Sequence, residues 1–387
     1  MLNIVLIGLV SFFVDVSTEM VYPLIPLYLT SALGATPAIV GVIEGIAESL
    51  ASLLKVWSGY ISDKYRKRKP LVFLGYSTAI IYKLALVVST SWFGILIARV
   101  IDRFGKGLRT APRDVLVSES ADKDKLGGAF GLHKALDMAG TAIGVLAAYF
   151  LLVQAGSGQP DYKNVFMWSV IPAVIGLVVL LFVKEKSVPR EKAAQPPHLI
   201  AGFKSLPFKL KLFLLTAFVF TLGNSSNAFL LLRAEESGWG SAGAVLLYFV
   251  YSAVSSLLSI PFGMRSDKTG RRRMLVIGYA MFAVTYFGFA LSTGKAWIAA
   301  MFVVYGFYTA LTAGVERALV AEIAPPEIKG TVLGLHSSIV GIALLPASVI
   351  AGALYNSVSP AAPFWLGGSL ALVASIALFF ILKDNKN

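Results

Sequence analysis

The sequence predicts an all-α membrane protein of about twelve transmembrane helices, arranged as two six-helix bundles related by a parallel pseudo-two-fold repeat. Three observations predict this fold. The chain has 387 residues, of which 57% are hydrophobic and only 14% are charged. Apolar runs of roughly 18 to 25 residues recur along it, each long enough to cross the hydrocarbon core as a helix. Short motifs also recur between its two halves.

The apolar runs favour helices over the strands of a β-barrel. Barrel strands alternate apolar and polar residues over about ten positions, and runs such as 173–183 show no alternation. The first run starts almost at Met1 and continues well past the core of a signal peptide, which indicates an uncleaved first span. The chain has no cysteine, which excludes disulfides and thiolate metal sites.

The spans follow one another between short turn-rich or charged stretches. In chain order they are predicted at 4–30, 37–61, 71–89, 92–116, 127–153, 164–183, 208–232, 241–264, 274–292, 296–320, 329–355 and 362–382. Pro23 and Pro26 predict a bend or break in the first span, and Pro346 predicts one in the eleventh. In the fifth span, Gly140 and Gly144 form a small-x-x-x-small pair that allows close helix contact.

Basic residues concentrate in the loops that follow the even-numbered spans. These residues are Lys64, Arg66, Lys67, Arg68, Lys69, Arg265, Lys268, Arg271, Arg272 and Arg273. The opposite loops carry few, namely Lys163, Arg233 and Lys295. By the positive-inside rule both termini face the cytoplasm, in a multi-pass protein of the cell inner membrane. The net charge of +13 is therefore a topology signal and does not indicate nucleic-acid binding.

The two halves are separated by the longest polar stretch, which contains several prolines and basic residues and reads as a cytoplasmic linker. On either side the sequence repeats itself. Residues 59–64 read Gly-Tyr-Ile-Ser-Asp-Lys and residues 263–268 read Gly-Met-Arg-Ser-Asp-Lys, while 131–133 and 334–336 both read Gly-Leu-His. The predicted domains are an N-terminal six-helix bundle at 1–183, the linker at 184–207 and a C-terminal six-helix bundle at 208–387.

The repeated loop resembles the signature of the major facilitator superfamily of secondary transporters, and the resemblance extends over essentially the whole chain. That signature is Gly-x-x-x-Asp-Arg/Lys-x-Gly-Arg/Lys-Arg/Lys. The second half matches it at Gly263, Asp267, Lys268, Gly270, Arg271 and Arg272. The first half matches it at Gly59, Asp63, Lys64, Lys67 and Arg68, with Arg66 where Gly is usual. The resemblance implies transport by alternating access between the two bundles.

A cytoplasmic gate is the role expected for the matched residues of the two loops. The predicted gate residues are Gly59, Asp63, Lys64, Gly263, Asp267, Lys268, Gly270 and Arg271. An aspartate at the end of a helix can pair across the seam while that side is closed, and basic residues can anchor a loop to anionic lipid headgroups. The alternative is that the basic residues only fix the orientation of the chain in the membrane. This alternative does not account for Asp63 and Asp267, because acidic residues contribute little to the positive-inside rule.

Two further patterns of the family are met in part. The family pattern of the fourth span is Arg-x-x-Gln-Gly-x-Gly. Arg99 and Gly105 match its first and last residues, whereas Asp102 and Arg103 stand where the pattern has Gln-Gly. The antiporter pattern of the fifth span is met at Gly140 and Gly144, whereas Val145 replaces its proline. The resemblance therefore gives weak support for export.

Ionisable residues inside the spans are the main functional candidates, because each costs at least about 2.5 to 3.5 kcal/mol at the centre of a span. They concentrate in the first half. The predicted proton-coupling residues are Asp15, Glu19, Asp137 and Glu48. The fourth span carries a basic stripe at helical spacing, namely Arg99, Arg103, Lys106, Arg109 and Arg113. Because the resemblance implies that helices 1 and 4 line the cavity, Arg99, Asp102 and Arg103 are predicted substrate-cavity residues. Asn224 and Asn227, in the middle of the seventh span, are predicted to contribute to an amide wall of the same cavity.

Asp15 and Glu19 lie one helical turn apart and are predicted to act as a pair. A carboxylate that alternates between a dry setting and the neighbourhood of an arginine binds a proton in one conformation and releases it in the other. The alternative is a set of structural ion pairs, such as Glu48 with Arg103 or Asp137 with Lys106. His133 and His336 are predicted to serve packing or gating, since neither has companion ligands at metal-site spacing.

The leading functional hypothesis is proton-coupled export of a drug-like or metabolic solute. Proton-coupled uptake of a small organic anion, bound at Arg99 or Arg103, is an alternative within the same class. A membrane sensor that binds solute without moving it is an alternative from another class. No P-loop, HExxH or GxSxG-type motif is present, so an enzyme is not predicted. The expected partners are a small-molecule substrate, protons and membrane lipid, without cofactor, metal or nucleic acid, and the protein is expected to be a monomer.

Overall fold

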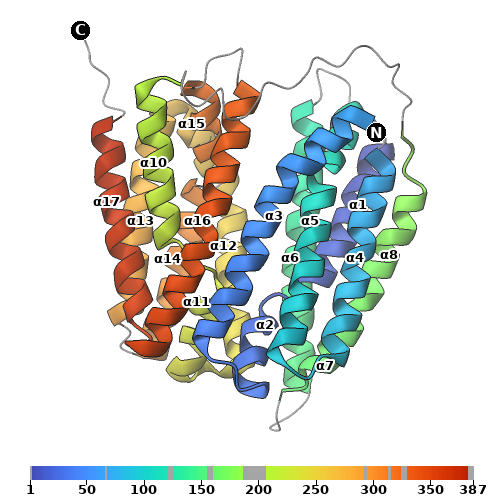
Figure 1. The fold of residues 1–387 in the computed structure, drawn as a ribbon, viewed down its shortest axis with the longest axis horizontal. Coiled ribbons are helices and arrows are strands. Elements are labelled where there is room, and N and C mark those ends of the chain that lie inside the picture. The colour runs from blue at the N-terminus through green and yellow to red at the C-terminus, as the bar shows by residue number, and fades with distance from the viewer. Residues whose placement is uncertain are drawn as a thin grey trace. The chain divides into compact units, whose positions relative to one another are not determined.

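The structure is a computed structural model whose described residues are 2–65, 68–120, 126–154, 160–185, 206–291, 294–312, 315–323 and 329–381. Within these ranges every regular element is a helix, which confirms the predicted all-α class (Figure 1). The chain forms two compact units. Unit 1 contains Met1–Thr36, Ile46–Ala194 and Gly240–Phe249, and unit 2 contains Pro37–Gly45, Gln195–Trp239 and Val250–Asn387.

Ten helical stretches in the described part of the chain are long and apolar enough to cross a membrane. Nine of them match one predicted span each, whereas Phe208–Ser259, with 52 residues, covers the seventh and eighth predicted spans. The fourth predicted span corresponds to α5 (Trp92–Ser120), which is not among the ten because its charged side chains make it less apolar. Each predicted span therefore has a helical counterpart.

Unit 1 holds most of the first half of the chain. Its helices, including the part of α3 that begins in unit 2, are α1 (Leu2–Glu19), α2 (Leu24–Leu27), the π-helical turn η1 (Tyr28–Ala32), α3 (Pro37–Tyr65), α4 (Arg68–Val88), α5, α6 (Leu126–Gln154), α7 (Tyr162–Trp168) and α8 (Val170–Leu181). The first span is interrupted between α1 and α2, at the position that Pro23 predicts. Proline has no N–H to continue the helical hydrogen bonds, so the chain turns before α2.

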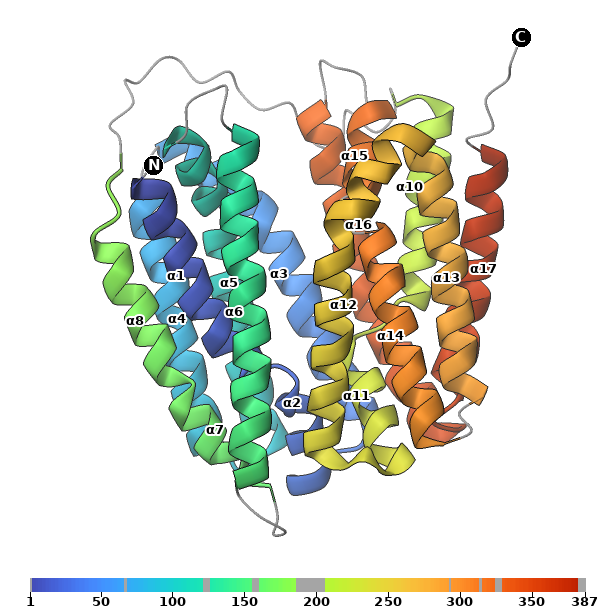
Figure 2. The same cartoon turned by 180° about the vertical axis from the view of Figure 1, so that it is seen from behind.

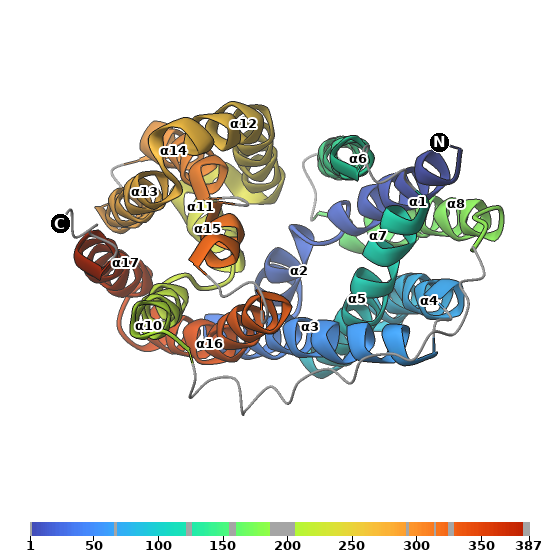
Figure 3. The ribbon, with the colours of Figure 1, turned by 90° about the horizontal axis from the view of Figure 1, so that it is seen from above.

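Glycines allow the closest helix contacts of unit 1. On α6, Gly140 and Gly144 lie against the backbone of α1, so that a Cβ atom at either position would clash. Figure 2 shows α1 and α6 side by side. On α5, Gly105 packs on α4 and Gly107 packs on α3, which places α5 between these two helices (Figure 3). These contacts position the charged residues of α1, α5 and α6.

Unit 2 holds most of the second half of the chain. Its helices, including α12, which begins in unit 1, are α10 (Phe208–Gly223), α11 (Ala228–Ala234), the π-helical turn η3 (Glu235–Trp239), α12 (Gly240–Thr269), α13 (Arg271–Leu291), α14 (Lys295–Thr312), α15 (Val315–Ile323), α16 (Lys329–Ser357) and α17 (Ala362–Ile381). The predicted seventh span at 208–232 is not one continuous helix. It is interrupted between Gly223 and Ala228, where Asn224 has the non-helical dihedral angles φ −94° and ψ 76°.

Prolines elsewhere do not interrupt their helices. Of the bend or break predicted at Pro346, a break is excluded, because α16 runs from Lys329 to Ser357 without interruption. Pro112 in α5 and Pro261 in α12 also lie inside continuous helices. An interior proline removes one backbone hydrogen bond, but within a membrane protein neighbouring groups can satisfy the freed carbonyl. Proline alone therefore does not locate the breaks in this fold.

Candidate functional site

The first cluster of polar residues in unit 1 surrounds two arginines of α5. This arginine cluster consists of Tyr22, Glu48, Arg99, Asp102 and Arg103. The side chains of Arg99, Asp102 and Arg103 are only 1–2% exposed, whereas that of Glu48 is 27% exposed. Spacings of three and four residues bring the α5 members to one side of the helix. The cluster is therefore a buried charge network whose accessible edge is the Glu48 carboxylate.

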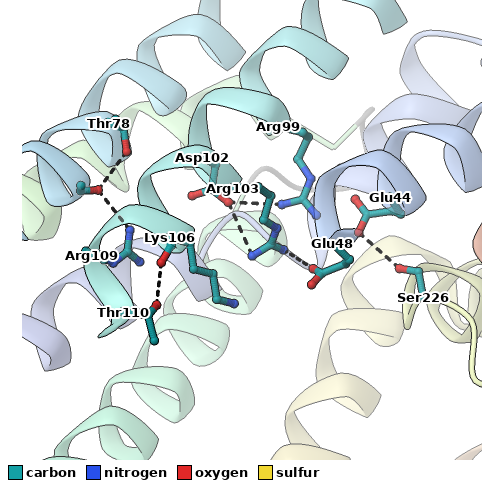
Figure 4. Close-up of polar contacts among 11 residues, drawn as sticks. Glu44, Glu48, Thr78, Arg99, Asp102, Arg103, Lys106, Arg109, Thr110 and Ser226 are labelled. Atoms are coloured by element: carbon teal, nitrogen blue, oxygen red, sulfur yellow. Dashed lines mark hydrogen bonds and ion pairs between the residues drawn. The ribbon is translucent and has the colours of Figure 1, made fainter. Parts of the chain in front are cut away.

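Arg103 lies between two carboxylates, as Figure 4 shows. Its guanidinium is 2.7 Å from the Glu48 carboxylate, which confirms the Glu48–Arg103 pair predicted as the structural alternative. Asp102 is 3.7 Å from Arg103 and 3.5 Å from Arg99. Charge-assisted N–H···O bonds are usually about 2.7–2.9 Å long. The contacts of Asp102 with the two arginines are therefore weaker than the contact of Glu48 with Arg103.

The Tyr22 ring faces both arginines. It lies in the turn between α1 and α2, and its ring centroid is 5.3 Å from the guanidinium carbon of Arg99 and 5.5 Å from that of Arg103. Both distances fall within the range of cation–π attraction. The turn before Pro23 thus supplies an aromatic face to which both guanidinium groups are attracted.

The second cluster lies where α1 packs on α6. This acid cluster consists of Ser11 and Asp15 on α1 and of His133 and Asp137 on α6. Asp15 lies within hydrogen-bonding reach of Asp137. His133 Nε2 is 2.9 Å from the Ser11 hydroxyl, and His133 Nδ1 is 4.0 Å from the Asp137 carboxylate. The structure thus brings Asp15 to Asp137 and also adds His133 to the predicted acids.

Glu19 lies one turn beyond Asp15 on the same face of α1. The Cβ atom of Asp15 is close to Gly140 and that of Glu19 is close to Gly144, so both acids face α6. The structure pairs Asp15 with Asp137 across the helix contact, in addition to the predicted proximity of Asp15 and Glu19 along α1. The close α1–α6 approach that the glycines allow is what brings the acids of the two helices together.

The remaining basic stripe of α5 binds other groups of unit 1. Arg109 donates to the Gly75 carbonyl oxygen at 3.3 Å, and its guanidinium lies 4.7 Å from the centroid of the Tyr76 ring. Arg113 donates to the Ser11 hydroxyl of the acid cluster at 3.4 Å and to Asp114 at 3.0 Å. The stripe therefore extends from the arginine cluster to the acid cluster along one helix.

Unit 2 contains an amide–tyrosine cluster, consisting of Asn224, Asn227, Tyr251, Tyr305 and Tyr308. The two asparagines lie in the interruption between α10 and α11. Tyr305 donates to the Asn227 side-chain oxygen at 2.8 Å, and the Asn227 amide nitrogen donates to Tyr251 at 3.4 Å. Asn224 donates to Tyr308 at 3.2 Å. Both predicted asparagines thus belong to one hydrogen-bonded cluster of aromatic side chains.

Two other polar pairs lie in unit 2, and one of them contains the predicted packing or gating residue His336. The Ser226 hydroxyl donates to Glu44, which lies in the α3 part of this unit, at 3.3 Å. His336 Nε2 is 2.8 Å from the Glu316 carboxylate, and the Phe213 ring stacks on the imidazole. The hydrogen bond and the ring stacking fit the packing role predicted for His336.

The predicted gate residues lie at the ends of two helices. Gly59, Asp63 and Lys64 belong to the last turns of α3, and Gly263, Asp267 and Lys268 belong to those of α12, but their side chains lie outside the described part of the structure. Gly270 ends α12 with φ 92°, a left-handed conformation that favours glycine. Arg271 then begins α13. The left-handed backbone conformation thus explains why the signature has a glycine at this position.

Comparison with known proteins identifies the family. The family model of the Major Facilitator Superfamily matches residues 7–232 and 212–387. The chain belongs to the major facilitator superfamily. It is 39% identical over 386 residues to the uncharacterized MFS-type transporter MJ1317 of Methanocaldococcus jannaschii, covering 98% of this chain and 94% of the relative. It is 24% identical to a multi-drug resistance efflux pump PmrA homolog of Lactococcus lactis, covering 98% of this chain and 94% of that protein.

Solved structures of transporters share the superfamily fold with this chain. The crystal structure of nucleoside transporter NupG aligns with a TM-score of 0.81 at 12% identity, covering 99% of this chain and 100% of NupG. The crystal structure of a D-xylose-proton symporter aligns with a TM-score of 0.76 at 18% identity, covering 100% and 98% of the two chains. The predicted fold of two six-helix bundles is confirmed, and the chain is a multi-pass membrane transporter of the major facilitator superfamily.

Three tyrosines of the amide–tyrosine cluster, together with Tyr22, were not among the predicted site residues. Tyr22 has a sequence signal, since it directly precedes Pro23 at the predicted break of the first span. Aromatic residues are frequent in the spans of this superfamily member, and 12% of the chain is Phe, Trp or Tyr. Composition therefore could not distinguish the functional candidates among the tyrosines from those that fill the bundles.

Proposed function

We propose that the protein is a proton-coupled secondary transporter of a small organic anion. The anion binds at Arg99 and Arg103, and the transported proton binds at the Asp15–Asp137 pair. The protein works as a monomer by alternating access in the cell inner membrane, with both termini in the cytoplasm. The observation that carries the proposal is the convergence of two buried guanidinium groups on Tyr22, with their shared carboxylate Asp102 at 3.5 and 3.7 Å.

The geometry of the arginine cluster favours exchange of one carboxylate for another. Arginine stays protonated at all working pH values, so each guanidinium needs an anion beside it. The contacts of Asp102 with the two arginines, at 3.5 and 3.7 Å, are longer than usual charge-assisted hydrogen bonds and are therefore more readily exchanged. An incoming carboxylate, sulfonate or phosphate group can form the short bidentate contacts that Asp102 does not make. The cluster is thus suited to bind an anion reversibly.

The acid cluster provides a separate place for the proton. Two carboxyl groups that lie close together can share one proton between them. Asp15 is held on α1, and Asp137 and His133 are held on α6. Movement of α1 against α6 would change the distance between the acids, and with it their affinity for a proton. Glu48 and Glu19 remain further candidates for the coupling site.

The amide–tyrosine cluster is proposed to bind the uncharged part of the solute. Tyr305→Phe removes the hydroxyl that donates to Asn227 and is expected to raise KM about fivefold, because one neutral hydrogen bond contributes about 1 kcal/mol. Tyr149→Phe makes the same change on α6, outside the amide–tyrosine cluster, where the tyrosine ring contacts Phe150 edge to face, and serves as the matched control. Transport kinetics in proteoliposomes measure both. An unchanged KM in Tyr305→Phe contradicts this role.

Export of a drug-like compound is the second candidate function. It is favoured by the 24% identity, over 98% of this chain, to a protein named as a multidrug efflux pump homolog. The aromatic side chains of the amide–tyrosine cluster are also compatible with an apolar solute. An exporter of this kind exchanges solute for protons, whereas the proposed anion transporter moves both in the same direction.

Transport by the purified protein in proteoliposomes separates the two candidates. Two sets of radiolabelled probes are compared. Organic carboxylates, sulfonates and phosphates test the proposed anion transport, and lipophilic cations test export. Under an imposed pH gradient, we expect the anions to accumulate in the alkaline compartment, since anion and proton enter together. Accumulation of the cations in the acidic compartment, without movement of any anion, supports export and rejects the proposed function.

The proposed topology predicts the labelling of single cysteines, which can be introduced without background because the chain has none. Lys184 follows α8 and Ser91 precedes α5, and both are exposed. A membrane-impermeant maleimide added to intact cells should label Ser91→Cys, and it should label Lys184→Cys only after the membrane is opened. Labelling of Lys184→Cys in intact cells would reverse the orientation derived from the basic loops.

A further inference from the structure

Lys83 is a fully buried cation that the proposed function does not use. It lies on α4 with 0% of its side chain exposed. Within the described residues, its Nζ atom has no hydrogen-bond partner, and the ring of the adjacent Tyr82 lies 5.1 Å away. Burying an ammonium group without hydrogen bonds is costly, and charges inside membrane proteins face partners or cavities. A role that requires this lysine to lack a fixed partner would explain the cost.

The packing of α4 on α5 places Lys83 at the level of Asp102. Gly75 on α4 contacts Gly105 and Arg109 on α5, and Gly105 also contacts Thr78. The two helices run in opposite directions. Residues that follow Thr78 on α4 therefore lie beside residues that precede Gly105 on α5, in the direction of Asp102. Lys83 therefore lies on α4 within one helical turn of the level of Asp102.

Lys83 is within electrostatic reach of both proposed sites. The charged groups that act on Lys83 are Asp102 and Arg109 from α5 and Asp15 from α1. Those that act on Asp15 include Asp137 from α6 and Arg109 and Arg113 from α5. The two carboxylates attract the Lys83 ammonium and Arg109 repels it. One cation thus has two acidic neighbours, of which one belongs to the arginine cluster and the other to the acid cluster.

We propose that Lys83 is an exchangeable counter-ion that pairs with Asp15 when Asp15 is ionised and with Asp102 when Asp15 is protonated. In the first state Asp102 stays with Arg99 and Arg103. In the second state Lys83 draws Asp102 away, and the two arginines become available to an anion. Charge remains balanced in both states, because each proton gained at Asp15 is matched by one negative charge bound at the arginines.

This exchange would couple the anion site to the proton site. Its consequence for transport rests on the proposed function. A proton at Asp15 raises the affinity for an anion at Arg99 and Arg103, and by linkage the bound anion raises the affinity for the proton by the same factor. Proton and anion therefore bind together and travel in the same direction. A lysine that paired permanently with one acid would give no such coupling.

A set of double-mutant cycles tests the exchange without any substrate. The thermal midpoint of the full-length protein in detergent is measured for Lys83→Met, Asp102→Asn and the double variant, each with Asp15 present and with Asp15→Asn, which mimics the protonated acid. We expect the Lys83–Asp102 non-additivity to be small with Asp15 present. With Asp15→Asn it should grow by on the order of 5 °C, as for the loss of a buried ion pair.

Controls keep the result interpretable. Lys69→Met makes the same change on the same helix, where the Lys69 ammonium donates to the Leu181 carbonyl oxygen, and its effect should add to that of Asp102→Asn. If Lys83→Met does not yield folded protein, Lys83→Gln replaces it. If neither Lys83→Met nor Lys83→Gln yields folded protein, Asp102→Asn is added to the Lys83 variant in the Asp15→Asn background. Recovery of folded protein then supports the Lys83–Asp102 pairing, and no recovery rejects it.

The proposed exchange is overturned if the effects of Lys83→Met and Asp102→Asn are additive both with Asp15 and with Asp15→Asn. It is also overturned if their non-additivity is the same in the two backgrounds. These outcomes are distinct from failure of the proposed function. If the cycles show the exchange but no organic anion is transported, the pairing stands and the assignment of the anion falls. If anions are transported and the cycles show no dependence on Asp15, the function stands and Lys83 does not connect the two sites.

Discussion

Arg103→Ala is expected to reduce anion transport about 100-fold or more. Truncating one partner of a buried charge-assisted contact costs about 2–5 kcal/mol, and 1.4 kcal/mol corresponds to a factor of ten. Arg103 donates to Glu48 at 2.7 Å and shares Tyr22 with Arg99, so its loss removes half of the proposed anion site. Initial rates of radiolabelled anion uptake in proteoliposomes measure the effect.

The variant also leaves Glu48 without its 2.7 Å partner, so a loss of transport alone does not separate binding from folding. Breaking a fully buried ion pair destabilises a protein by about 3–5 kcal/mol, and the cost is smaller here because Glu48 is 27% exposed. The double variant Arg103→Gln/Glu48→Gln removes both charges and should recover most of the stability. We expect it to remain inactive, whereas recovery of transport would assign Arg103 to a structural ion pair.

Asp15→Asn is expected to abolish accumulation driven by a pH gradient while solute exchange at equal pH on both sides continues. The asparagine mimics a permanently protonated site, so solute can still bind and cross, but no proton is released. Asp137→Asn should have the same effect, since the two carboxyls lie within hydrogen-bonding reach of each other. Uptake and counterflow in proteoliposomes measure the two activities separately.

Asp161→Asn is the matched control for these variants. Asp161 accepts a hydrogen bond from the Asn164 amide at the start of α7, and asparagine caps a helix nearly as well as aspartate. Its accumulation should equal that of the parent. If Asp15→Asn and Asp137→Asn both concentrate solute as the parent does, the coupling residue lies elsewhere, and Glu48 becomes the next candidate.

The sequence was sufficient for the fold because the membrane restricts the choice of structure. Only helices and closed barrels satisfy every backbone group within lipid, and the apolar runs show no strand alternation. The repeated loop motif then defined the two halves. The breaks were harder to locate, because Pro23 interrupts the first span while Pro346 lies inside a continuous helix. Whether a proline ends a helix depends on neighbouring groups that one sequence does not specify.

For the candidate site, the sequence identified charged residues more readily than their partners. Burial cost singles out Asp15, Glu48 and Arg103 from a single sequence, because apolar spans rarely carry charge. It does not say that Asp15 meets Asp137, since that contact depends on the close approach of α1 to α6 at Gly140. Tertiary contacts of this kind join residues far apart in the chain, so helical spacing alone could not reveal them.

The most direct test of the proposed anion–proton transport measures both ions in one preparation. Proteoliposomes that contain a trapped pH indicator receive membrane-impermeant organic carboxylates, sulfonates or phosphates from outside, without an imposed gradient, and the Arg103→Gln/Glu48→Gln protein corrects for leakage. We predict saturable acidification of the lumen that follows anion entry and disappears in Asp15→Asn. Anion entry without acidification, or acidification that persists in Asp15→Asn, would contradict the proposal that the proton at Asp15 and the anion at the arginines move together.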